Sequence, residues 1–479
     1  MESPVAASVR TAAVRLLPSF PLIAALIAYS VVLFVPAVLN DADTYWHLAT
    51  GDWILDHHAV PHTDPFSFTM AGQPWVAHEW LSEVLMALAY RAGGWSTVAL
   101  LFACAAAVTA GALARYLSRW LSLPAAALVA LLGTACVSPS LLARPHLLAL
   151  PMLTLWTIGL LSAEAHASAP RPRLLVLMLI WANLHGSFVL GLAMIPALAA
   201  DAMLDARGQD VRRCLRNWSL FFIAAVTTSL LTPHGANGLL FPFRLLAMHH
   251  VAQIGEWRPL DLTTLQPLEP ALAVLGYVMA FRRVRVPLVR LLIVLGLACL
   301  AYRHARHEML AGIVGAAMLA EPLGRSFGPP PAAAKSRAPL PGAAVALACA
   351  IALAALRFAH PIVRGDDPVS PVAAVAAVPA DRLDAPVLNS YEFGGYLVFR
   401  HVKPFVDGRA DMYGDAFMSA YFDALKPDRA AIERLVERYR IRWALLAAHG
   451  TLAEAMATLP GWRRIHADNV AVAFVRDGP

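Results

Sequence analysis

The sequence predicts an α-helical polytopic membrane protein of about 11 transmembrane helices with a small C-terminal α/β domain outside the membrane. Three observations support this fold class. Apolar runs of about twenty residues recur between Pro21 and Leu356, the length that spans a bilayer. Charged residues make up only 15% of the 479 residues, whereas about a quarter is usual in soluble proteins. After about Pro368 the composition changes to that of a soluble domain.

The positions of the arginines predict the orientation. Arg10 and Arg15 precede the first apolar run, residues 21–39, which places the N-terminus in the cytoplasm because basic loops stay on that side. No signal-peptide cleavage site follows this run. Arginines flank the run 174–203 on both sides, so we expect two short helices that meet at a break at 181–186. The basic loops then lie inside and the C-terminus outside.

The predicted domain organisation divides the chain after residue 367. Residues 1–367 form the transmembrane domain, with two long outer loops at 40–94 and 232–270. Residues 368–479 form the small outer domain. Its pattern predicts a charged helix at 429–440 and strands at 387–389, 396–399, 404–407, 443–446 and 470–475. The five cysteines include no CxxC pair, which argues against cysteine-bound zinc or cysteine redox chemistry.

The first outer loop has an unusual composition. Residues 40–83 hold seven acidic residues and five histidines, and no Lys or Arg occurs between Asn40 and Arg91. Asp41 and Asp43 lie at the mouth of the first span, and a helix beginning near Thr44 would place His47 one turn from Asp43. Such a carboxylate pair can accept a proton or hold a divalent cation. The alternative is a helix N-cap, which Asp favours.

Other ionisable residues are expected near the outer ends of the spans. His78 and Glu79 either complete an acid/base or metal cluster or form an exposed first helical turn. Arg144 and His146 begin a span, where ionisable groups favour a functional role, although snorkelling also explains Arg144. The predicted break contains Asn183 and His185. Their polar side chains are expected either to face a cavity or to form hydrogen bonds within the bundle.

Three further groups complete the candidates. One group is a cationic cluster at the outer end of a span: Arg303, His304, Arg306 and His307. It either binds the oxygens of a phosphate or anchors the protein to lipid headgroups. A triplet in the second outer loop could bind sugar by stacking and hydrogen bonding: Glu256, Trp257 and Arg258. A set in the C-terminal domain either forms ion pairs or binds an acceptor, and we favour a structural role facing the first loop: Asp407, Arg409 and Asp411.

Taken together, these segments resemble the GT-C class of membrane glycosyltransferases, and within it a bacterial subgroup. The likeness covers most of the chain and is carried by DADTYWHLATGDWI, TDPFSFT, WVAHEWLSE, WANLHGSF, IGEWRP, NSYEFGGYLVF and PFVDGRADMYGDAF. The resemblance implies an inverting sugar transfer on the extracytoplasmic face of the bacterial inner membrane. The donor would be a polyprenyl-phosphate-linked sugar, the acceptor a hydroxyl of a glycan, lipid or protein, and the base Asp41 or Asp43.

The expected site combines the resemblance with the residue patterns. The catalytic candidates are Asp41, Asp43 and His47. The donor phosphate would meet Arg144, Arg303 and Arg306. The remaining candidates would bind substrate: His78, Glu79, His146, Asn183, His185, Glu256, Trp257, Arg258 and His307. Whether a divalent cation, Mg²⁺ or Mn²⁺, is held by Asp41, Asp43 and His78 is left open.

Two other function classes stay as alternatives. A transporter or flippase for a lipid-linked or anionic solute would carry polar residues near mid-membrane in two related halves, and the sequence has no such internal repeat. A non-enzymatic envelope assembly protein would use the C-terminal domain as its binding module. The basic residues lie in short loops between spans, which indicates membrane topology and not nucleic-acid binding.

Overall fold

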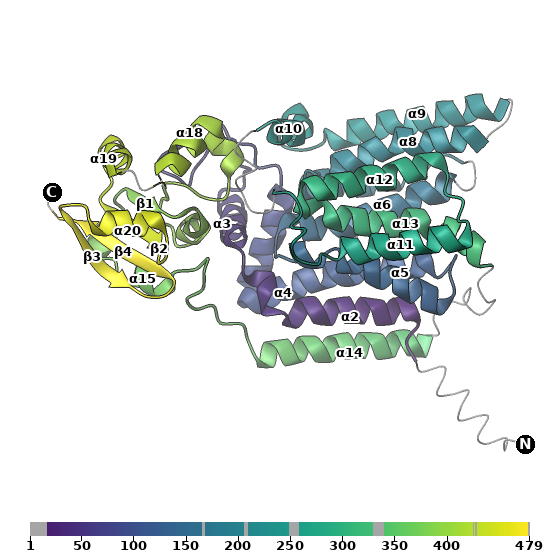
Figure 1. The fold of residues 1–479 in the computed structure, drawn as a ribbon, viewed down its shortest axis with the longest axis horizontal. Helices are drawn as coiled ribbons and strands as arrows, with labels where there is room; N and C mark the ends of the chain where they lie inside the picture. The colour runs from purple at the N-terminus through teal and green to yellow at the C-terminus, as the bar shows by residue number, and fades with distance from the viewer. Residues whose placement is uncertain are drawn as a thin grey trace, which may run out of the picture.

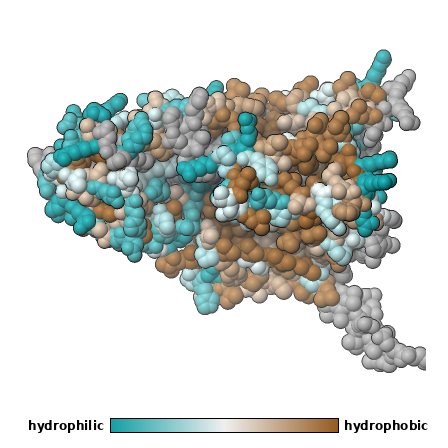
Figure 2. Space-filling view, in the orientation of Figure 1, coloured by the Kyte–Doolittle hydropathy of each residue, from teal (hydrophilic) through white to brown (hydrophobic). Residues whose placement is uncertain are grey.

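The computed structural model describes residues 17–164, 168–205, 209–248, 258–328, 340–424, 426 and 429–477. Long helices lie side by side in a bundle, and the C-terminal part of the chain forms a mixed α/β unit at one end of it (Figure 1). The bundle presents a largely hydrophobic surface, whereas the C-terminal unit is hydrophilic (Figure 2). We call residues 366–477 the C-terminal unit.

The bundle follows the apolar runs of the sequence. Its helices are α2 (Phe20–Phe34), α4 (Trp80–Leu117), α5 (Leu123–Ala135), α6 (Pro145–Glu164), α7 (Leu174–Leu184), α8 (Phe188–Asp205), α9 (Gln209–Ser229), α11 (Leu268–Arg282), α12 (Leu288–Arg303), α13 (Glu308–Phe327) and α14 (Leu340–Ala359). The expected break at 181–186 is confirmed, because α7 ends at Leu184 and α8 begins at Phe188.

Four stretches of the described chain are long and apolar enough to cross a membrane: Trp80–Leu117, Leu123–Ser140, Pro145–Glu164 and Leu340–Ala359. The expected total of about eleven spans therefore stays a prediction, as does the domain division after residue 367. Glycines let some bundle helices approach closely. A side chain on Gly312 of α13 would place its Cβ 2.5 Å from the carbonyl oxygen of Gly133 on α5. Such small-residue contacts are typical of membrane helix pairs.

Two shorter helices lie outside the bundle core. The α2–α4 loop (residues 35–79) contains α3 (Ala42–His57), which Asp41 caps by accepting a hydrogen bond from the backbone amide of Thr44 at 3.1 Å. The helix thus begins two residues earlier than expected. A second helix, α10 (Ala236–Leu246), follows α9. It lies at the end of the bundle nearest the C-terminal unit and is viewed along its axis in Figure 1.

The C-terminal unit is built on a four-stranded sheet in the order β1-β2-β4-β3. Strand β1 (Val387–Asn389) is parallel to β2 (Trp443–Ala447), while β4 (Ala471–Arg476) is antiparallel to both β2 and β3 (Trp462–Ala467). The helices are α15 (Val372–Ala376), α16 (Ala380–Leu383), α17 (Gly394–Phe399), α18 (Ala410–Ala424), α19 (Arg429–Arg438) and α20 (Thr451–Ala457). The predicted α/β character and the helix at 429–440 are confirmed.

Two predicted strands are wrong. Residues 396–399 form part of α17, because Gly395 brings this helix against the backbone of α3: a Cβ there would lie 2.1 Å from the carbonyl oxygen of Ala42. This contact overrides the β preference of the sequence. Residues 404–407 are not a strand, because the Asn389 side chain bonds their backbone in place of a ladder. It accepts from the amide of Phe405 and donates to the carbonyl of Val406, both at 2.8 Å.

A buried arginine joins the C-terminal unit to the α2–α4 loop. Arg409 donates to Asp64 of the loop at 2.7 Å and to Asp407 at 2.6 Å, and all three side chains are 0% exposed. Its guanidinium also lies over the ring of Trp75, 4.7 Å from the centroid, a favourable cation–π geometry. The expected structural role facing the loop is confirmed for Asp407 and Arg409, and the pair is buried, not a surface set.

Replacing Arg409 with methionine should destabilise the fold by about 3–5 kcal/mol, because Asp64 and Asp407 would remain as buried carboxylates without their partner. The measurement is thermal or denaturant unfolding in detergent, followed by tryptophan fluorescence. Arg429, whose ion pair with Glu433 is exposed, provides the control: Arg429→Met should change stability by less than about 1 kcal/mol. Equal losses in both variants would contradict the role given to the buried network.

Candidate functional site

Nine of the fifteen sequence-predicted site residues line one cavity of about 410 Å³ between the bundle and the C-terminal unit. One part of its wall is apolar and comes from α6, α8, α10, α12 and α13. The other part is ionisable and comes from the α2–α4 loop, the starts of α6 and α13, the α7–α8 break and the C-terminal unit. The ionisable lining residues are Asp43, His47, His78, Glu79, Arg144, His146, His185, Arg306, His307 and Asp411.

Arg144 links Asp41 and Asp43, at the start of α3, to the start of α6. Its Nε donates to Asp41 Oδ2 at 2.8 Å, Nη2 bonds Asp41 Oδ1, and Nη1 lies 2.9 Å from Asp43 Oδ2. Asp41 also serves as the N-cap of α3 and does not line the cavity, whereas Asp43 does. The capping alternative therefore applies to Asp41, and Asp43 is the carboxylate that faces the cavity.

Gly408 covers the other side of Asp43. A Cβ on Gly408 would lie 1.8 Å from Asp43 Oδ1 and 2.7 Å from Nε1 of Trp46. The C-terminal unit can therefore approach the start of α3 only because this residue has no side chain. Gly408 thus fixes the position of Asp43 from a point more than 360 residues away in the sequence.

Glu79 lies at the meeting point of three imidazoles. Its Oε1 is 3.4 Å from Nε2 of His185 and 3.6 Å from Nε2 of His78, while Oε2 is 3.9 Å from Nε2 of His47. Burial raises the pKa of Glu79 to about 8, although the positive charge of Arg306 opposes the shift. Near neutral pH Glu79 is therefore largely in its acid form.

The second nitrogen of each ring has a partner. Nδ1 of His47 lies 3.1 Å from Oε1 of Glu83, and Nδ1 of His185 lies 2.8 Å from Oγ of Ser187. Nδ1 of His78 lies 3.4 Å from the carbonyl oxygen of Val76, and the His78 ring stacks on Phe241 of α10, with ring centroids 4.0 Å apart. Because both ends of the His47 and His185 rings are engaged, their Nε2 atoms are held toward Glu79.

The C-terminal unit contributes residues that sequence reasoning did not place in the site. Asp411, at the start of α18, lines the cavity together with Tyr391 and Gly408. Burial raises the pKa of Asp411 to about 6, against the opposing charge of Arg409. The alternation of Asp407, Arg409 and Asp411 identified this segment as a candidate in the sequence. Only the fold shows that Asp407 and Arg409 form a buried ion pair, whereas Asp411 faces the cavity.

Several predicted residues lie elsewhere. Asn183 supports the α7–α8 break, accepting from Nε1 of Trp80 at 2.7 Å and donating to the carbonyl of Leu231 at 3.2 Å. Arg258 and Arg303 are not among the described residues that line the cavity. The remaining two predictions lie outside the described residues: Glu256 and Trp257.

The suggested metal set is not assembled. Arg144 occupies both oxygens of Asp41, while His78 turns its Nε2 toward Glu79. Within the described part of the chain, no group of three or more His, Cys, Asp or Glu side chains is arranged to hold a metal ion. The residues that converge with Asp43 are imidazoles and carboxyls, which can also transfer protons.

The pKa of Glu79 predicts a stability change with pH. Folded Glu79 retains a proton up to about pH 8, whereas the unfolded chain releases it near the ordinary value of 4.5. Stability should therefore fall as pH rises from about 6.5 to 8, a window in which the depressed pKa of His78 and His47 keeps both rings neutral. Unfolding in detergent should show this slope, and Glu79→Gln should reduce it. The exposed Glu433→Gln should keep the full slope; an unchanged slope in Glu79→Gln would refute the assignment.

Two solved structures share this fold. The archaeal oligosaccharyltransferase AglB from Archaeoglobus fulgidus, in complex with an inhibitory peptide and a dolichol-phosphate, matches with a TM-score of 0.54 and 12% identity over 96% of this chain and 74% of that chain. The apo form of the Archaeoglobus fulgidus oligosaccharyltransferase matches with a TM-score of 0.52 and 12% identity over 89% and 69%. No family model and no curated protein matches the chain.

At this identity the likeness concerns the fold alone. AglB is a GT-C class membrane glycosyltransferase. Four stretches of the described chain are long and apolar enough to cross a membrane, as expected for a membrane protein of this fold. The expected resemblance is thus confirmed at the level of architecture: the chain has the fold of GT-C class membrane glycosyltransferases.

Proposed function

We propose that this protein is a glycosyltransferase that moves a sugar from a polyprenyl-phosphate-linked donor to an acceptor hydroxyl. The observation that carries the proposal is the two-sided cavity. Its apolar wall suits an isoprenoid chain, and its ionisable wall suits a sugar phosphate. The similarity to an oligosaccharyltransferase seen with a dolichol-phosphate supports a lipid-linked donor.

Asp43 is the proposed base. The acceptor oxygen attacks the anomeric carbon of the sugar, the bond from that carbon to the phosphate oxygen breaks, and the hydroxyl proton passes to Asp43. Asp41 is bonded at both oxygens by Arg144 and caps α3, so it positions Arg144 and does not meet the acceptor. A carboxylate in hydrogen-bond reach of the hydroxyl is the group this step requires.

Arg306 is the proposed partner of the donor phosphate. It lines the cavity beside Met309 and Leu310 of α13, where the apolar and ionisable walls meet. A phosphate there would place its isoprenoid chain along the apolar wall and its sugar toward Asp43. The charge of Arg306 would stabilise the phosphate as it leaves. Arg144 is already paired with two aspartates, so we assign it to holding them.

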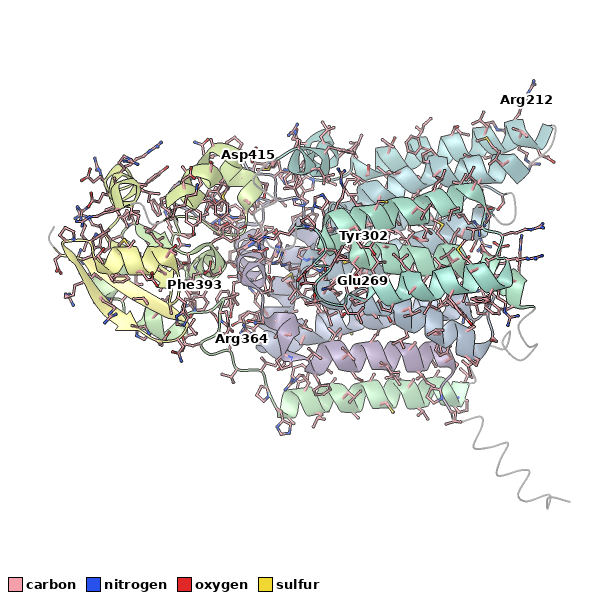
Figure 3. The ribbon with its side chains drawn as sticks, viewed as in Figure 1. Arg212, Glu269, Tyr302, Arg364, Phe393 and Asp415 are labelled. Atoms are coloured by element: carbon pink, nitrogen blue, oxygen red, sulfur yellow. The ribbon has the colours of Figure 1, made fainter. Side chains whose placement is uncertain are left out.

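The proposed orientation puts the cavity on the extracytoplasmic face of a bacterial inner membrane. The labelled Arg212, one of several arginines that follow α8, lies at the bundle end opposite the C-terminal unit (Figure 3). The positive-inside rule places that end in the cytoplasm. Tyr302 and Glu269 lie at the end that faces the unit (Figure 3).

Asp43→Asn should lower sugar transfer by at least about 10²-fold, because it keeps the side-chain shape and removes the base. The assay follows radiolabelled sugar leaving a panel of polyprenyl-phosphate sugars in membranes that supply the acceptor. Asp56 provides the matched control, since it lies on the same helix but pairs with Arg91 at the surface. Asp56→Asn should transfer at the wild-type rate. Full activity in Asp43→Asn, or no transfer by the wild type from any donor in the panel, would reject the proposal.

Arg306→Gln should raise the apparent KM for the lipid-linked donor by about tenfold or more, because the phosphate loses a charge-assisted partner. The same assay measures it over a range of donor concentrations. Arg244→Gln is the control, because this exposed arginine of α10 contacts Asn237 and does not line the cavity. Equal donor KM values in all three proteins would contradict the placement of the phosphate.

A further inference from the structure

The proposed reaction leaves three polar side chains of the cavity without a role: His78, Glu79 and His185. The Glu79 carboxyl is at their centre. Its Oε1 is 3.4 Å from Nε2 of His185 and 3.6 Å from Nε2 of His78, and its Oε2 is 3.9 Å from Nε2 of His47. All three distances exceed the about 2.7–3.2 Å of a good N–H···O bond. These groups therefore keep hydrogen-bonding capacity for a ligand that enters the cavity.

The hydrogen bonds behind His185 determine which of its nitrogens carries the hydrogen. The backbone N–H of Ser187 donates to Nδ1 at 3.1 Å, so Nδ1 is an acceptor. Oγ of Ser187 lies 2.8 Å from the same nitrogen and accepts from Nε1 of Trp181 at 3.0 Å, so the Ser187 hydroxyl donates to Nδ1 as well. The hydrogen of the His185 ring is therefore on Nε2, the atom that faces Glu79.

His78 has the opposite polarity. Its Nδ1 lies 3.4 Å from the carbonyl oxygen of Val76, and because a carbonyl only accepts, this nitrogen carries the hydrogen. Burial lowers the pKa of His78 to about 3, so its Nε2 keeps a lone pair near neutral pH. The stacking on Phe241 holds the ring in this orientation. Nε2 of His78 is thus a hydrogen-bond acceptor beside Glu79.

The Glu79 carboxyl both donates and accepts. Burial raises its pKa to about 8, so near neutral pH one of its oxygens carries a hydrogen. Apart from the imidazoles, it is surrounded by carboxyls, which favour the acid form, and by guanidiniums, which oppose it. They are Asp43, Glu83 and Asp411, and Arg144 and Arg306. Donors and acceptors without a full charge match a hydroxyl group, which donates one hydrogen and accepts others.

The position of Glu79 indicates which part of the substrate it meets. Glu79, Arg306 and Asp43 line the same cavity, and the charges of Arg306 and Asp43 both act on Glu79. Glu79 therefore lies close to the proposed phosphate site and to the proposed base. The transferred sugar must bridge these two points, because its anomeric carbon is bonded to the phosphate oxygen and is attacked by the acceptor. A hydroxyl of that sugar is the group within reach of Glu79.

We propose that His78, Glu79 and His185 form a specificity subsite for one hydroxyl group of the transferred sugar, an inference that rests on the proposed function. The Glu79 carboxyl donates to the hydroxyl oxygen, and Nε2 of His78 accepts the hydroxyl hydrogen. His185 is a positioning residue, because its Nε2–H faces Oε1 of Glu79 and leaves the acid hydrogen on Oε2. A sugar without this hydroxyl leaves buried polar groups without partners, and such sites reject such analogues strongly.

The first test measures kcat/KM for the sugar that the wild type transfers from the donor panel. Glu79→Leu removes the hydrogen-bond donor and should lower kcat/KM by about 10²-fold. Glu79→Gln should recover most of that loss, because its amide also donates. In the wild type kcat/KM should fall as pH rises through about 8, where Glu79 loses its hydrogen. Glu79→Gln should lack this fall, and the exposed Glu433→Gln should keep it.

The second test uses monodeoxy versions of the same sugar donor. One of them should lose about 10²-fold in kcat/KM with the wild type, and it should lose nothing further with Glu79→Leu, because the bond is already absent. If Glu79→Leu does not fold, the pH profile of Glu79→Gln and the deoxy series with the wild type decide.

Three results would overturn the subsite alone. They are a loss in Glu79→Gln as large as in Glu79→Leu, additive losses for the deoxy donor and Glu79→Leu, and equal kcat/KM values for every monodeoxy donor with the wild type. Full transfer by Asp43→Asn would instead reject the underlying function.

Discussion

One buried guanidinium holds together the two parts of the molecule that form the ionisable wall of the cavity. Arg409 of the C-terminal unit lies between Asp64 and Asp407 with no exposed surface. Such a group is stable only with its carboxylates in place, so the α2–α4 loop and the C-terminal unit must dock in one arrangement. That arrangement carries Gly408 onto Asp43 and Asp411 into the cavity wall. The acidic loop of the sequence thereby becomes a fixed wall of the cavity.

A second arginine performs the corresponding role at the start of the loop. Arg144 binds Asp41 and Asp43 and so attaches the first turn of α3 to α6. Arg144 and Arg409 thus hold the α2–α4 loop at two separate points, Asp41–Asp43 and Asp64. The cavity contains carboxyls of differing proton affinity near neutral pH. Burial, which raises the pKa of Glu79 to about 8 and of Asp411 to about 6, provides that difference.

Much of this organisation could be predicted from the sequence, and the reasons for the failures are physical. Apolar runs gave the bundle, and the arginines around residues 174–203 gave the α7–α8 break, because both are local signals. Two members of the cationic cluster, Arg306 and His307, line the same cavity as residues of the acidic loop, whereas Arg303 does not. The helix at 394–399 was missed because a backbone contact of Gly395 with α3 overrides local β preference. Asp411 and Glu83 were not placed in the site because only tertiary packing distinguishes a cavity wall or a buried partner from an ordinary helix turn.

The central claim is that a lipid phosphate and a base share this cavity. The most direct measurement is a cryo-EM map of the protein in lipid nanodiscs with a polyprenyl monophosphate added. The account predicts phosphate density beside Arg306, within the space that Asp43 and Glu79 line, and isoprenoid density along the apolar wall formed by α8, α10 and α13. Lipid phosphate bound at another part of the bundle, with this cavity holding none at saturating lipid, would contradict it.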